Sequence, residues 1–142
     1  MILYADTSYL LSLYLLDANS SIAAADARSR SDLLVVSVLA ELEFFAGAGS
    51  RKFHAEITAQ QLQAATTAFA ADFGQSLLRS SPVADLFNRG LALARQYCAT
   101  DNCRTLDILH LAFALSEKAD VLLSFDQRQR SLALKLGLQI GP

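Results

Sequence analysis

The chain has 142 residues, a net charge of −2 and a pI of about 5.6. Folding at this length buries roughly two-thirds of the unfolded chain's surface, so a core needs no disulfides. The charge excludes a nucleic-acid binder held by a strongly basic surface. With 53% hydrophobic and 18% charged residues, the composition leaves apolar surface for a partner, and we expect a homodimer or another tight complex.

Nothing in the sequence indicates a membrane span or a secretory signal. No run of about 18 apolar residues occurs, and the apolar start has no basic residues before it and contains Asp6. We expect a cytoplasmic protein. Its two cysteines, Cys98 and Cys103, are expected to be reduced thiols, because no other thiolate or imidazole accompanies them as a zinc ligand.

In the first half of the chain, apolar runs that end at helix-capping residues predict alternating strands and helices. The run after Met1 ends at Asp6, and a β-branched run ends at Ser37; both residues can cap a following helix. Glycines predict that the helix after Ser37 ends near Ala46. In chain order we expect a strand at 2–5, helices at 9–16 and 22–30, a strand at 33–36 and a helix at 38–46.

In the second half, helical spacing of apolar residues alternates with compact apolar runs. Alanine and glutamine dominate up to Gly74, and the short run after it is a candidate strand. Pro82 favours a helix start, Thr105 can cap the next helix and Gly137 ends the last one. In chain order we expect a helix at 54–73, a strand at 76–78, helices at 81–97 and 106–118, a strand at 121–124, a helix at 127–136 and an edge strand at 138–140.

The order of these elements predicts the fold class. Strands separated by helices, with connections too long for hairpins, favour an α/β fold with a short central parallel sheet flanked by helices on both faces. No internal repeat, low-complexity segment or linker divides the chain. We therefore expect residues 1–142 to form a single domain.

Four acidic residues lie near the predicted carboxyl ends of the strands, where open parallel sheets bind ligands. Asp6 and Asp126 follow strands directly, Glu41 lies one helical turn beyond a strand, and Asp107 opens a helix. Carboxylates that converge in this way need a divalent cation, and an all-oxygen site favours Mg²⁺ or Mn²⁺. Such an ion activates water and stabilises a leaving oxygen, which suits hydrolysis of a nucleic-acid phosphodiester.

The four acids lie in segments with a specific order and spacing. These segments are Tyr4-Ala5-Asp6-Thr7-Ser8, then Val36 to Glu43 with Gly47 after it, then Leu106 to Ala114, and finally Leu123 to Asp126 with Gly137-Leu138 after it. Together they resemble the signatures of PIN-domain nucleases, most closely the VapC-type toxins of bacterial toxin–antitoxin pairs. The resemblance covers the chain from end to end. It implies a PIN-like fold, a Mg²⁺- or Mn²⁺-dependent endoribonuclease acting on RNA, a homodimer and a cognate antitoxin.

The motif match also implies the roles of individual residues. The expected catalytic and metal-binding acids are Asp6, Glu41, Asp107 and Asp126. Thr7, Ser8 and Ser124 are expected to support them, Ser124 standing where the family usually has threonine. Glu43 is a rival of Glu41, but Ala-Glu-Leu matches the family pattern at Glu41, and Glu43 lies about 200° round the helix from it.

Each acid has a simpler explanation when it is taken alone. Asp6 and Asp126 can cap helices, Asp107 can offset a helix dipole, and Glu41 can be a solvated helix residue. All four explanations holding together is improbable, which favours a site. His110, one turn after Asp107, is expected to be a packed or hydrogen-bonded residue rather than a metal ligand.

Three arginines flank the third and fourth motifs and are candidates for binding the RNA backbone: Arg104, Arg128 and Arg130. Ordinary solvated arginines are the alternative. An acidic pI is compatible with RNA binding at this local positive charge. Leaving out the four site carboxylates changes the net charge from −2 to +2. Where Tyr14, Phe44 and Phe45 emerge, we expect a groove for an amphipathic antitoxin helix.

Two other functions fit parts of the sequence. A catalytically inactive PIN-fold protein could bind RNA or act as a scaffold, but such a protein has no reason to retain four clustered acids. A phosphatase of the haloacid dehalogenase type also needs an acid after the first strand. That class expects a second aspartate two residues later, where this chain has Ser8.

Overall fold

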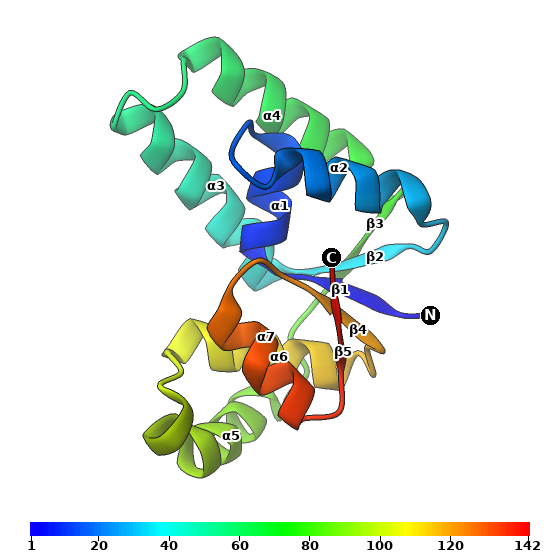
Figure 1. Cartoon of the computed structure of the whole chain (residues 1–142), viewed down its shortest axis with the longest axis vertical. Helices are drawn as coiled ribbons and strands as arrows, with labels where there is room; N and C mark the ends of the chain where they lie inside the picture. Colours follow the sequence, from blue (N-terminus) through cyan, green and yellow to red (C-terminus); the bar gives the residue numbers. More distant parts are fainter.

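The computed structural model describes residues 1–142. Five parallel strands form one sheet in the order β3-β2-β1-β4-β5, with helices on both faces (Figure 1). The strands are β1 (Leu3–Ala5), β2 (Leu34–Ser37), β3 (Leu77–Ser80), β4 (Val121–Leu123) and β5 (Gln139–Gly141). The helices are α1 (Thr7–Tyr14), α2 (Ser20–Ser29), α3 (Val38–Phe53), α4 (Ala59–Asp72), α5 (Leu86–Asp101), α6 (Thr105–Ser116) and α7 (Gln127–Lys135). The predicted α/β fold class is confirmed.

Alternate residues of the central strands face two separate cores. Leu3 and Ala5 of β1 pack with residues of α1, α2, α3 and α4, whereas Tyr4 packs with residues of α5, α6 and α7. Ala5 pairs with Val36 of β2 and Leu123 of β4. The carboxyl ends of these three strands are therefore level, and the residues that follow them meet at one edge of the sheet.

Helix α3 is longer than predicted, because Gly47 and Gly49 do not end it. It continues to Phe53, and α4 begins only at Ala59, where Thr58 provides a capping box. A Cβ atom at Gly47 would lie 3.1 Å from Cδ1 of Leu11 in α1. Gly47 therefore allows close packing between two helices, a requirement that a local pattern of helix-ending residues does not show.

The prediction that Phe44 lines a groove for an antitoxin helix is wrong. This ring is fully buried, and it packs against Tyr14 and Phe69 at centroid distances of 5.7 and 4.1 Å. Its neighbour Phe45 is 43% exposed. Phe44 points into the core because it lies four residues after the buried Ala40 on α3, whereas Phe45 lies on the adjoining face.

We expect Phe44→Ala to lower the free energy of unfolding by about 3–5 kcal/mol, because it removes a buried ring and leaves a cavity. Phe45→Ala is the matched control and should cost less than about 1.5 kcal/mol, since its ring keeps contact with water. Urea denaturation followed by circular dichroism measures both changes. Equal losses would show that Phe45 also belongs to the core in solution.

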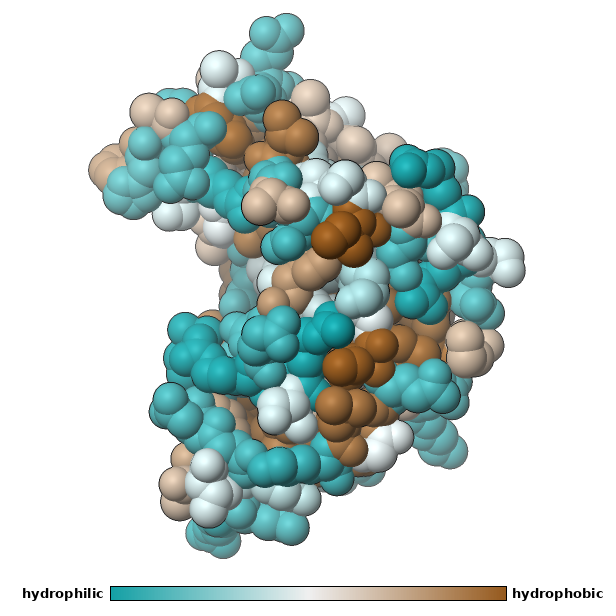
Figure 2. Space-filling view, viewed as in Figure 1, coloured by the Kyte–Doolittle hydropathy of each residue, from teal (hydrophilic) through white to brown (hydrophobic).

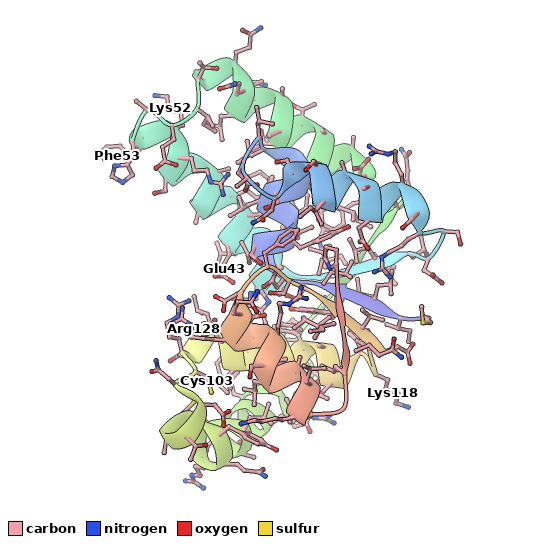
Figure 3. The ribbon with its side chains drawn as sticks, viewed as in Figure 1. Glu43, Lys52, Phe53, Cys103, Lys118 and Arg128 are labelled. Carbon is pink, nitrogen blue, oxygen red and sulfur yellow. The ribbon has the colours of Figure 1, made fainter.

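The surface is hollowed between two parts of the molecule. Figure 2 shows this hollow between the projecting α3–α4 arm and the part built from α5, α6 and α7. Glu43 on α3 and Arg128 on α7 lie on its two sides (Figure 3). No helix has the length and apolar character that crossing a bilayer requires.

Candidate active site

Asp6 is the most buried of the acids and lies where β1 passes into α1. It caps this helix: Oδ1 accepts hydrogen bonds from the Tyr9 backbone N–H at 2.9 Å and from the Ser8 hydroxyl at 2.7 Å. Oδ2 accepts from the Ser124 hydroxyl at 2.5 Å, and only 2% of the residue is exposed. The helix-capping explanation is therefore correct, but it does not account for a second, long-range partner, Ser124, which directly follows β4.

Burial gives the Asp6 carboxyl an unusual acidity. Removal from water raises its pKa above the ordinary value, and the hydrogen bonds from Ser124, Tyr9 and Ser8 offset only part of this rise. A carboxylate at this place is stabilised by any added positive charge. That property is expected of a residue that binds a cation.

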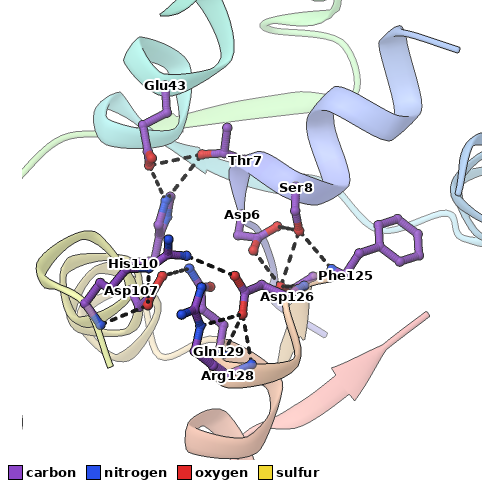
Figure 4. A network of polar contacts seen from close by, with 12 residues as sticks. Asp6, Thr7, Ser8, Glu43, Asp107, His110, Phe125, Asp126, Arg128 and Gln129 are labelled. Carbon is purple, nitrogen blue, oxygen red and sulfur yellow. Dashed lines mark hydrogen bonds and ion pairs between the residues drawn. The ribbon is translucent and has the colours of Figure 1, made fainter. Parts of the chain in front are cut away.

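Asp126 follows β4 and caps α7 in the same way. Its Oδ1 accepts from the Arg128 backbone N–H at 2.8 Å. Two serines join this turn to the β1–α1 turn: Ser124 donates to Asp6 and accepts from the Asp126 N–H at 3.0 Å, and Ser8 accepts from the Phe125 N–H at 2.8 Å (Figure 4). The two strand ends are thus fixed side by side with their aspartates on the same edge.

Asp107 reaches this edge from the first turn of α6 and is 5% exposed. Its Oδ2 accepts from the Arg104 backbone N–H at 3.0 Å, which completes a capping arrangement. Its Oδ1 accepts from Nε2 of Gln129 at 3.5 Å. The Gln129 side chain is buried beside the acids, and its Oε1 has no hydrogen-bond partner. Sequence analysis did not single out Gln129.

The two glutamates of α3 have different surroundings. Glu41 is held by Arg79 of β3, with N–O distances of 2.7 and 2.8 Å, and its polar partners do not include the residues around the aspartates. Glu43 instead accepts from Nε2 of His110 at 2.5 Å and from the Thr7 hydroxyl at 3.1 Å (Figure 4). Thr7 follows Asp6 in the chain, so the structure brings Glu43 to the acidic edge and leaves Glu41 outside it.

Glu43 differs from Asp6 in the direction of its pKa shift. Burial alone would raise the pKa of this carboxyl, but the hydrogen bonds from His110 and Thr7 lower it below the ordinary value. The negative charge of Asp107 acts on Glu43 in the opposite direction. The two carboxyls are therefore close enough to influence each other, as members of one site must be.

The three predicted RNA-binding arginines differ in their contacts. Arg104 joins two acids, with its Nε 3.4 Å from Asp107 and its Nη2 3.4 Å from Asp126, and its side chain is 63% exposed. Arg128 lies 3.8 Å from Asp126 and is 41% exposed. Arg130 binds the carbonyl oxygens of Ser124 and Pro142 and therefore holds the chain end in place. Arg104 and Arg128 remain available at the edge of the site.

A family comparison decides what kind of domain this is. The PIN domain model matches residues 3–135. The chain belongs to the PIN domain family. This membership confirms the resemblance seen in the four motifs. A search of curated proteins finds no relative with significant sequence similarity.

Solved structures show the same PIN fold. The toxin VapC20 of Mycobacterium tuberculosis, described as cleaving the sarcin–ricin loop, superposes with a TM-score of 0.74 at 16% identity, over 92% of this chain and 94% of its own. VapBC2 of Rickettsia felis, bound to a promoter DNA fragment, gives 0.68 at 16% identity, with 99% and 98% covered. A toxin–antitoxin complex of Klebsiella pneumoniae gives 0.64 at 19% identity, with 92% and 91% covered. At these identities the likeness concerns the fold alone.

The donor atoms of this PIN domain suit a hard divalent cation. All four converging acids supply carboxylate oxygens, and the Arg104 guanidinium between Asp107 and Asp126 shows that positive charge is accommodated there. As the side chains stand, no three acidic, histidine or cysteine residues are close enough together to hold one ion. The charge and chemistry of the residues fit such a cation.

Proposed function

We propose that this chain is a divalent-metal-dependent endoribonuclease and the toxin of a toxin–antitoxin pair. The observation that carries the proposal is the convergence of four acids from separate elements on one edge of the sheet. These acids are Asp6, Glu43, Asp107 and Asp126. Glu43 takes the place expected for Glu41, because it contacts Thr7 and His110 beside Asp6, whereas Glu41 is paired with Arg79.

The metal, Mg²⁺ or Mn²⁺, would be held by the carboxylates of Asp6, Asp107 and Asp126, with Glu43 completing the set. When bound, it supplies an activated water and stabilises charge on the phosphodiester. Ser8 and Ser124 hold the Asp6 carboxylate by hydrogen bonds from both of its sides. This support limits rotation of the ligand, as partners behind metal ligands do in other sites.

Arg104 and Arg128 supply the positive charge for the RNA backbone. Both side chains are long and largely exposed, and a guanidinium can bind a phosphate through two parallel hydrogen bonds. Arg104 contacts Asp107 and Asp126 only at 3.4 Å, so it can leave them when a cation neutralises these acids. The two arginines then lie at the edge where the phosphodiester must enter.

The partners follow from the family and from the fold relatives. We propose a cognate antitoxin, because one structural relative is a toxin–antitoxin complex. A homodimer agrees with the apolar side chains that the isolated chain leaves exposed, among them Phe53 and Phe87 at 83% and 72%. The RNA itself is selected by the shape and charge of the rim around the acids.

The test is cleavage of total cellular RNA by the purified chain, first shown by mass spectrometry to be free of a bound inhibitor. We expect discrete fragments with Mg²⁺ or Mn²⁺ and none with EDTA. Mapping the fragment ends then identifies the target. An absence of cleavage with every metal would favour a catalytically inactive RNA-binding or scaffold protein. Cleavage that continues in EDTA would contradict the metal site.

A further inference from the structure

A buried chain of polar side chains leads from β2 to Glu43. The Ser37 hydroxyl lies 2.7 Å from the Tyr4 hydroxyl, which lies 2.9 Å from Nδ1 of His110. Nε2 of the same imidazole lies 2.5 Å from Oε1 of Glu43 (Figure 4). Ser37 and Tyr4 are 0% exposed and His110 is 2% exposed. Water cannot replace any of these hydrogen bonds, so the protein must satisfy each group itself.

The hydroxyl and imidazole hydrogens of this buried series all have acceptors only if each group donates toward Glu43, starting from Ser37. The Ser37 oxygen already accepts from the Ala40 backbone N–H at 3.0 Å, and the only acceptor for its own hydrogen is the Tyr4 oxygen. The Tyr4 hydrogen then goes to Nδ1 of His110, which must be unprotonated. Nε2 therefore carries the ring hydrogen and donates it to Glu43. In the reverse direction the Ser37 hydroxyl would have no acceptor.

We propose that Tyr4 and His110 are positioning residues that hold the Glu43 carboxylate in one orientation at the acidic edge. A glutamate has three rotatable side-chain bonds, and this one is only partly buried, so its direction must be fixed by its partners. His110 fixes it through Nε2–H, and the Tyr4 hydroxyl holds the imidazole ring in place through Nδ1. Both imidazole nitrogens are engaged, and His110 itself is no metal ligand.

The burial of these groups also argues against a purely packing role. A leucine at position 110 would fill apolar space without a polar partner, whereas a buried imidazole is stable only when both nitrogens are satisfied. The inference about metal binding rests on the proposed function, since Glu43 is positioned for a cation. The tautomer of His110 does not depend on that function and can be measured without metal or RNA.

The test uses Tyr4→Phe, which keeps the ring and removes only the hydroxyl. Nitrogen-15 NMR of the metal-free protein should show His110 as the Nε2–H tautomer, with the Nδ1 signal of a hydrogen-bonded acceptor in the wild type and of a nitrogen without a hydrogen bond in Tyr4→Phe. The chain has only two histidines, and His54 is exposed, so the signals can be assigned. We further expect the Kd for Mn²⁺, measured by calorimetry, to rise about 10-fold or more in Tyr4→Phe.

Tyr14→Phe is the matched control, because its hydroxyl also binds a carboxylate, Asp72, outside the site. It should leave the Nδ1 signal of His110 and the Mn²⁺ affinity unchanged. His110→Gln keeps a donor for Glu43, and it should bind Mn²⁺ more tightly than His110→Leu. If His110→Leu does not fold, Tyr4→Phe still decides the matter.

Two results would overturn separate parts of the argument. An unchanged Nδ1 signal and an unchanged Mn²⁺ affinity in Tyr4→Phe would show that Tyr4 only fills space, and the positioning role would fail. A wild-type protein that binds no Mn²⁺ at all would overturn the proposed function. In that case the nitrogen signals would still show whether the Tyr4 hydroxyl binds Nδ1 of His110.

Discussion

Asp6→Asn should lower the rate of RNA cleavage by about 10³-fold or more, which is about 4 kcal/mol of transition-state stabilisation. Loss of a residue that only supports a metal ligand typically lowers metal affinity or activity about 10- to 100-fold. Asp6 is the supported ligand itself and lies at the centre of the acids, so its loss should have a larger effect. Asparagine keeps the size of the side chain but removes its charge. Single-turnover cleavage of a mapped RNA target, with saturating protein and Mn²⁺, measures the loss.

The same substitution should make the metal-free protein more stable at neutral pH. Burial raises the pKa of Asp6 in the folded state, so the folded protein binds this proton more tightly than the unfolded chain. The protonated Asp6 therefore contributes its full share of stability at pH values below its pKa in the unfolded chain. This contribution is lost as the pH rises through its pKa in the folded protein. Above that range the wild type carries a penalty that Asp6→Asn avoids. Denaturation in EDTA between about pH 4 and pH 8 should show the difference growing with pH.

Added metal should reverse this order of stability. A ligand that binds only the folded state at about 100 times its Kd adds about 2.7 kcal/mol. Mn²⁺ should therefore stabilise the wild type and have little effect on Asp6→Asn. A variant that cleaves RNA at the wild-type rate would remove Asp6 from the mechanism. A metal-free variant that is less stable than the wild type at neutral pH would show that its hydrogen bonds outweigh its charge.

The sequence was sufficient to predict the two aspartates that follow strands. Asp6 and Asp126 each end an apolar run and cap the next helix, and both properties are local. Because parallel strands of one sheet end at the same edge, local positions also predicted their proximity. The serine pair that joins them, Ser8 and Ser124, was expected to support the acids, although its long-range contacts were not foreseen.

Local sequence positions did not decide between Glu41 and Glu43, because that choice depends on which face of α3 meets α1. The buried stripe of this helix contains Ala40, Phe44 and Ala48, with Gly47 packed on α1. Glu43 lies on that stripe, three residues after Ala40 and four before Gly47, and Glu41 does not. The spacing was present in the sequence. Its meaning required knowing that α3 continues past Gly47.

Contacts between distant segments account for the other differences. Arg130 binds carbonyl oxygens at the chain end, and Arg79 pairs with Glu41 across 38 residues of sequence. Neither partner can be inferred from local periodicity. The buried chain through Tyr4 and His110 was also beyond the motif analysis, which included Tyr4 in the first motif without giving it a role and expected His110 to be packed or hydrogen-bonded without naming its partners. Polar atoms on buried strands become visible as functional groups only when their partners are known.

Glu43→Gln and Glu41→Gln should therefore have very different effects. We expect Glu43→Gln to lower the RNA cleavage rate by about 10²-fold or more, since it removes a negative charge from the acidic edge. Glu41→Gln should change the rate by less than about 2-fold, because Glu41 forms only an exposed ion pair with Arg79, and such pairs are weak. Cleavage of the mapped RNA under identical conditions measures both variants.

The pair is closely matched, so the comparison isolates position. The two glutamates lie on the same helix, undergo the same substitution, and have side chains that are 25% and 26% exposed. A difference between them cannot come from helix propensity or general surface charge. The opposite result, with Glu41→Gln inactive and Glu43→Gln active, would return Glu41 to the site. It would also require α3 to rotate from the position where His110 and Thr7 now hold Glu43.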